Sequence, residues 1–113
     1  MFKEMSQLAG LMGKLPRIKE EFAKFQAKAS EITAEGRSGG DMVTVRVNGK
    51  MQVLSCRLNP DTAPLQDREM LEDLIAAATN QALEKVRQLL AEEARRVADE
   101  IGLPPGIAIP GLS

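Results

Sequence analysis

The chain has 113 residues, of which 43% are hydrophobic and 27% are charged, so its size and composition predict one globular domain with a modest core. No apolar run approaches the roughly 18 residues that a membrane-spanning helix needs, and Met1-Phe2-Lys3-Glu4 does not resemble the start of a secretory signal. A single cysteine, Cys56, excludes an internal disulfide and predicts a reducing, cytoplasmic location.

Charge is unevenly distributed along the chain, although the formal net charge is only −1. Residues 1–30 contain six Lys/Arg and three Glu, which gives +3, whereas residues 31–113 contain nine Lys/Arg and thirteen Asp/Glu, which gives −4. Such an asymmetry indicates an anionic partner for the basic segment. The alternative is that a long surface helix carries solvated lysines.

The first predicted element is a helical arm whose apolar residues follow the 3-4 spacing of a heptad repeat. Pro16 interrupts this segment, because proline has no backbone N–H and clashes inside a helix but suits its first turn. We therefore expect the arm helix at about residues 15–30, after a short, weakly specified helical segment at 5–13. The apolar seam comprises Leu8, Leu11, Leu15, Ile18, Phe22, Phe25, Ala29 and Ile32.

A basic edge runs beside this seam. Cations at helical spacing can contact phosphates without reading any base sequence. Lys19 lies on the opposite flank of the seam, and the edge itself comprises Lys14, Arg17, Glu21, Lys24 and Lys28.

The middle of the chain has strand patterns. Residues 32–40 predict a short strand that passes into a loop. Residues 42–48 alternate between two faces, and the residues that share one face are Val43, Val45 and Val47. Residues 50–58 alternate again and predict the return strand.

Asn48-Gly49 is the strongest local hairpin signal, because a type I′ turn needs positive φ at both central residues. Cys56 falls on the same face of the return strand as Leu54 and Leu58. We therefore expect Cys56 to be a small buried hydrophobe rather than a nucleophile.

A long helix is predicted at about residues 67–101, with Asp67 as its N-cap and Gly102 as its stop. At 1.5 Å per residue it would be about 50 Å long. Residues 104–113 form a Pro/Gly-rich tail, predicted to be extended. The apolar stripe of the helix comprises Leu71, Leu74, Ile75, Ala78, Ala82, Val86, Leu89 and Val97.

Polar residues of this helix have local explanations. Glu84 and Arg87 have the spacing of a surface ion pair, as does Glu92 with Arg95 and Arg96. Asn80 either forms a hydrogen bond to a strand backbone or fixes the register of a dimer, or it lies at the solvent edge.

No pattern in the sequence supports catalysis. Histidine is absent, which removes the usual general base and the commonest metal ligand. The acidic residues Glu69, Glu72 and Asp73 suit the positive end of a helix dipole better than a cation site. We expect no enzymatic activity, no cofactor, no metal and no small-molecule substrate.

These elements predict an α+β fold: an N-terminal helix, a small antiparallel sheet and a long C-terminal helix. One such chain would leave the arm seam and part of the long helix in water, so we expect a homodimer. From the residues alone, the arm could bind either a polyanion or a helix of another protein. In the second case the chain is a protein-interaction module without direct DNA binding.

The chain resembles the YbaB/EbfC family of bacterial nucleoid-associated proteins over nearly its whole length. The matching motifs, in order, are Met1-Phe2-Lys3, Leu11-Met12-Gly13-Lys14, Val43-Thr44-Val45-Arg46-Val47-Asn48-Gly49, the segment Glu69 to Ala82, and Leu103-Pro104-Pro105-Gly106. The resemblance implies one domain at residues 1–103 and a tweezer-like homodimer with projecting N-terminal helices.

The resemblance further implies binding to double-stranded DNA with low or variable sequence specificity, in the nucleoid, with roles in nucleoid organisation and gene regulation. Two departures from the family pattern are Pro16 in the arm and the slightly acidic net charge. Carried over by position, the DNA-binding residues are the arm cations Lys14, Arg17, Lys19, Lys24 and Lys28, followed by Arg95 and Arg96.

Overall fold

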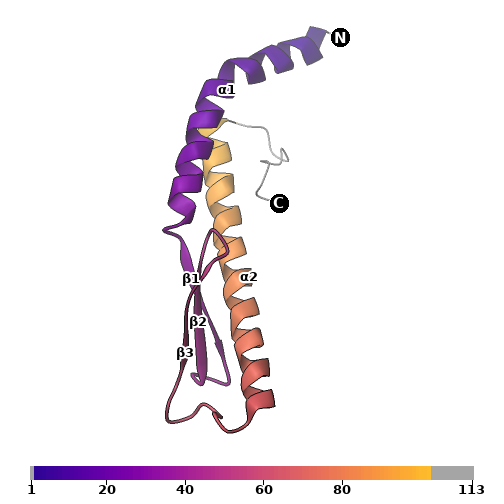
Figure 1. Ribbon diagram of the computed structural model, residues 1–113. Coiled ribbons are helices and arrows are strands. Elements are labelled where there is room, and N and C mark those ends of the chain that lie inside the picture. The colour runs from indigo at the N-terminus through magenta and orange to yellow at the C-terminus, as the bar shows by residue number, and fades with distance from the viewer. Residues whose placement is uncertain (1, 103–113) are drawn as a thin grey trace.

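A computed structural model describes residues 2–102, except for the side chains of residues 2–7 and 11. Its elements follow the order α1 (Phe2–Ala29), β1 (Thr33–Ser38), β2 (Val43–Asn48), β3 (Val53–Leu58) and α2 (Arg68–Ile101) (Figure 1). The α+β fold predicted from the sequence is therefore confirmed. The molecule is elongated, with a longest extent of 69 Å. The tail predicted at residues 104–113 lies outside the described residues.

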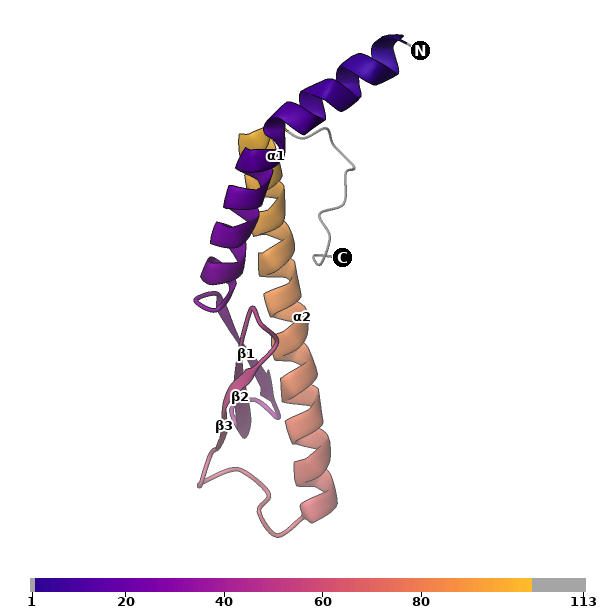
Figure 2. The ribbon, with the colours of Figure 1, turned by 45° about the horizontal axis from the view of Figure 1, so that its top comes forward.

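The helix α1 is continuous through Pro16, so the expected start near residue 15 is wrong. Proline removes one backbone hydrogen bond, but Pro16 is exposed to solvent, so water can satisfy the carbonyl that this bond would have used. Figure 2 shows a bend in α1, and Pro16 lies at the middle of this helix. The segment before the bend projects past the end of α2, and the rest of α1 runs alongside α2.

The sheet is antiparallel, with strand order β1-β2-β3. The predicted face of β2 is confirmed, because Val43, Val45 and Val47 are fully buried. They pack against small residues on α2, among them Ala78 and Ala82. The strand β1 comes very close to this helix. A Cβ built on Gly36 would lie 1.9 Å from the Ala78 carbonyl oxygen, so only glycine fits there.

The turn between β2 and β3 differs from the predicted type I′ geometry. Neither Asn48 nor Gly49 has a positive φ, and the positive value falls on Met51 at 61°. Asn48 is buried, and its Oδ1 accepts hydrogen bonds from the backbone N–H groups of Lys50 and Gln52. Gly49 is needed because the end of α1 comes close to its backbone. Its N–H donates to the Ala29 carbonyl oxygen, and a Cβ at this position would lie 2.3 Å from that oxygen.

The helix α2 has the predicted caps. The Asp67 side chain accepts a hydrogen bond from the Met70 N–H at 3.1 Å, and Gly102 ends the helix in the left-handed conformation. At 34 residues, α2 is about 51 Å long. Its first part covers β1 and β2, and its last part packs on α1. In the second contact Val97 and Ile101 meet Phe25, with Leu90 beside them instead of the predicted Leu89, which is exposed.

The strand β3 is an edge strand that α2 does not cover, and here one expectation fails. Cys56 is exposed. It lies opposite Val45, on the face that α2 covers elsewhere, but the helix packs over β1 and β2. The neighbouring Val53 and Leu54 are 55% and 48% exposed. The apolar side of β3 is therefore open in the single chain.

Candidate nucleic-acid interface

The five arm cations do not share one environment in the structure. Lys14 lies beside the end of α2, where its ammonium group donates to the Gly102 carbonyl oxygen at 3.3 Å. A cation suits this position, because the C-terminal carbonyls of a helix carry partial negative charge. Lys14 therefore also joins the two helices.

Lys24 and Lys28 are both paired with carboxylates. Lys24 lies 3.5 Å from Glu20 and from Glu21 on its own helix, and these two charges raise the pKa of the lysine, with Glu21 the larger cause. Lys28 bonds across to Glu93 of α2 at 3.0 Å. Both lysine side chains are more than half exposed, so they can still exchange these partners for others.

Glu93 is the centre of a charged cluster between the helices. Its side chain is only 15% exposed and accepts hydrogen bonds from Arg96 and from Lys28. The bonds from Arg96, followed by those from Lys28, lower the pKa of Glu93 from 4.5 to about 2. Arg96 also pairs with Glu100, and its pKa is raised, chiefly by its hydrogen bonds to Glu93. Arg96 is thus ion-paired as expected, but with partners other than Glu92.

Three of the predicted site residues form no ion pair among the described residues: Arg17, Lys19 and Arg95. All three are exposed. At 100° per residue, Arg17 and Lys19 lie about 200° apart around α1. The structure thus separates these two cations, whereas it gathers Lys28 and Arg96 around Glu93.

A second basic surface lies on the face of the sheet opposite α2. It contains Arg37, Arg46 and Arg57, none of which is among the predicted site residues. Register orients all three, because residues that alternate with the buried valines point away from α2. Arg37 and Arg57 both pair with Thr44, one from each side, and Arg46 follows two residues later on the central strand. The period-two alternation around Val43, Val45 and Val47 was the signal for Arg46.

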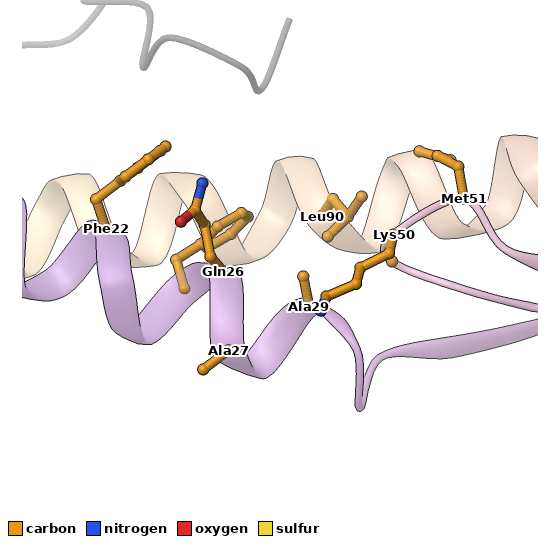
Figure 3. Close-up of a pocket in the computed structure, with 9 residues that line it drawn as sticks. Phe22, Gln26, Ala27, Ala29, Lys50, Met51 and Leu90 are labelled. Carbon is orange, nitrogen blue, oxygen red and sulfur yellow. The ribbon is translucent and has the colours of Figure 1, made fainter.

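An open groove of about 530 Å³ lies where α1 meets the β2–β3 turn (Figure 3). Phe22 and Gln26 rise from α1 on one side of it and Met51 from the turn on the other, whereas Ala27 points away. Leu90 of α2 lies between them, and Lys50 is the one charged residue that lines the groove. The groove can therefore accept apolar groups, and it brings together no acid–base pair.

The described residues contain neither a membrane-spanning helix nor a group of metal ligands. Within residues 2–102, no helix is long and apolar enough to cross a membrane. In the same part of the chain, His, Cys, Asp and Glu side chains form no group of three that could hold a metal ion. Glu72 at the start of α2 pairs with Arg68 at 3.0 Å, as expected of a surface carboxylate.

Comparison with known proteins matches residues 4–101 to the model of the YbaB/EbfC DNA-binding family. The chain is 40% identical to a nucleoid-associated protein of Granulibacter bethesdensis over 94% of its length and 99% of that protein. It is 36% identical to one of Rhizobium meliloti, with the same coverage. Among solved structures, it resembles the uncharacterized protein HP0035 of Helicobacter pylori, with 25% identity, a TM-score of 0.58, and coverage of 72% of this chain and 94% of that one.

Proposed function

The chain belongs to the YbaB/EbfC DNA-binding family, and from this premise we propose that it is a nucleoid-associated homodimer that binds double-stranded DNA. Binding would act mainly through phosphates, with low or variable sequence specificity, and would serve nucleoid organisation and gene regulation. The family match over residues 4–101 carries the proposal, and the net +3 of residues 1–30 supports it. Phosphate contacts supply affinity without sequence information.

The contacts of the arm cations suggest how each would act. Arg17, Lys19 and Arg95 would meet phosphates directly, since no carboxylate among the described residues holds them. Phosphates would compete with carboxylates for Lys24, Lys28 and Arg96. Lys14 would keep its bond to the end of α2 and add to the local potential.

The homodimer is supported by the open apolar side of β3. Val53, Leu54 and Met51 are each 41–55% exposed on neighbouring positions, which is unusual for a lone edge strand. Fully burying one such side chain is worth about 1.5–3 kcal/mol, so a twofold contact that covers the remaining exposed part on both copies would gain several kcal/mol. A second copy of the chain would provide that cover.

Titration of a fluorescent DNA duplex at several salt concentrations tests the proposal. Counterion release predicts the tightest binding at low salt, and each phosphate contact adds about 0.9 to the slope of log affinity against log salt. Replacing Arg17 and Lys19 by Gln should lower that slope. The matched control replaces Arg68 and Arg87, which pair with glutamates of their own helix. Failure of the unaltered protein to bind duplex DNA at low salt would refute the proposal.

The alternative, a protein-interaction module, has one supporting observation. Leu8, Met12 and Leu15 are 45–61% exposed in the N-terminal half of α1. However, Phe25, a central residue of the predicted seam, is buried against α2 and is not available to a partner. Charge reversal at Lys24 and Lys28 distinguishes the two functions, because it should damage DNA binding more than capture of a protein partner.

A further inference from the structure

We propose that the outer face of the sheet is a second phosphate-binding surface for duplex DNA, formed by Arg37, Arg46 and Arg57. The inference rests on the proposed function and goes beyond the helical arms to which the family resemblance assigns DNA contact. The sheet is a different element from the helical arms, so DNA contact by the sheet can be disproved while DNA contact by the arms still stands.

Strand register places the three guanidinium groups on one face. Arg37 on β1 and Arg57 on β3 are both partners of Thr44 on β2. Because neighbouring strands lie about 4.8 Å apart, their Cα atoms are about 10 Å from each other. Arg46 lies two residues along β2 from Thr44, or about 7 Å further. One cluster therefore spans all three strands.

The charge balance of this face favours an anion. The strands contain a single acidic residue, Glu35, which lies 3.6 Å from Arg37. Arg46 reaches only the Thr33 hydroxyl, at 3.4 Å, and Arg57 forms no ion pair among the described residues. The face therefore carries a net +2 per chain, whereas the arm lysines Lys24 and Lys28 have carboxylates within 3.5 Å.

The face is also open. The helix α2 covers the inner face of the sheet, where Gly36, Val43 and Val45 lie. The helix α1 packs on α2 and not on the outer face of the sheet. Figure 1 shows both helices beside or beyond the sheet, with none of the described helices across its outer face. Three long cationic side chains can therefore extend into solvent without displacing another element.

DNA fits this face better than a second copy of the chain does. The residues that strand pairing places on this face are polar, and two faces of +2 would repel each other, whereas the apolar side of β3 offers a second copy a better contact. B-DNA presents one phosphate charge per about 1.7 Å of helix axis, so a patch about 10 Å wide meets several phosphates. Arginine suits such contacts, because its planar fork can bind two phosphate oxygens at once.

The test compares two double variants in the full-length protein. Arg46→Gln with Arg57→Gln removes two charges from the outer face, and Arg68→Gln with Arg87→Gln removes two from α2. If both outer-face residues contact phosphate, the first pair lowers the salt slope of duplex binding by about 1.8 per chain, and the control pair leaves it nearly unchanged. Thermal unfolding followed by circular dichroism should show both pairs folded, because all four side chains are exposed.

A third variant should strengthen binding. Glu35→Gln removes the only carboxylate of the strands while keeping its backbone carbonyl, which accepts a bond from Lys85. Its net charge rises by one, and its salt slope should not fall below that of the unaltered protein.

The outcomes separate the two proposals. Unaltered binding by the outer-face pair, together with lost binding by Arg17→Gln with Lys19→Gln, would overturn this inference and leave the proposed function standing. Equal losses in the outer-face pair and the control pair would also overturn it, because they would indicate net charge alone. A loss confined to binding of an acidic polypeptide, with duplex binding intact, would assign the face to a protein partner. No duplex binding by the unaltered protein would overturn both proposals.

Discussion

Glu93 should make the contact between α1 and α2 depend on pH. The pKa of this carboxyl is lowered from 4.5 to about 2, chiefly by hydrogen bonds from Arg96 and then by those from Lys28. A depressed folded-state pKa stabilises the protein at pH values above the unfolded-state pKa. The stabilisation is therefore complete above about pH 5 and is lost as the pH falls toward 2.

The magnitude follows from the shift. A difference of about 2.5 pKa units corresponds to at most about 3.4 kcal/mol. Lys28 and Arg96 are each about half exposed, so solvent screening reduces this figure. We therefore expect Glu93→Gln to lower the free energy of unfolding by roughly 1–2 kcal/mol at pH 7.

Urea unfolding at pH 7, 5, 4 and 3, at one fixed protein concentration, measures this effect. The unaltered protein and Glu93→Gln should converge as the pH falls, because protonated Glu93 loses the same charge that glutamine lacks. Glu72→Gln is the control, since its pair with Arg68 is exposed and should contribute less than about 0.5 kcal/mol. A difference as large at pH 3 as at pH 7 would show that packing, and not charge, is responsible.

Three further predictions concern the fold and the dimer. Gly36→Ala should cost about 1–3 kcal/mol or more in urea unfolding, because its Cβ would lie 1.9 Å from the Ala78 carbonyl oxygen and push α2 off β1. Gly10→Ala should raise stability by about 0.5–1 kcal/mol in the same measurement, because no described atom lies within 4 Å of the new methyl group; a loss would indicate an unseen contact. Val53→Glu should convert the proposed dimer to monomer in sedimentation at micromolar concentration. Leu65→Glu, which is equally exposed but lies in a loop, should leave the dimer intact.

Local chemistry was sufficient to predict the elements of the fold. Alternation indicated the face that Val43, Val45 and Val47 share, and the positions of Asp67 and Gly102 indicated both ends of α2. Each of these signals depends on a few consecutive residues, so the rest of the molecule does not alter it.

Two of the incorrect predictions involve residues whose role depends on a distant partner. Gly49 is small because the Ala29 carbonyl approaches it, and not because the turn needs positive φ. Cys56 is exposed because α2 lies over β1 and β2 and leaves β3 uncovered. Pro16 does not end α1, because it is exposed and water can satisfy the carbonyl that lost its partner. Alternation in a strand identifies its two faces, but it does not tell how far across the sheet a helix will extend.

The net charge of a segment likewise does not tell which of its cations are available to bind a partner. The net +3 of residues 1–30 counts Lys28 as available, although its nearest partner is Glu93, 65 positions away. The net −4 of residues 31–113 conceals Arg46 and Arg57, which the sheet register brings to one face with a single carboxylate in its strands. Segment charge indicated an anionic partner, but it located only part of the surface that could meet one. If DNA binds the basic surface that the folded sheet forms, replacing Arg46 and Arg57 should weaken binding at least as much as replacing Arg17 and Lys19 of the arm.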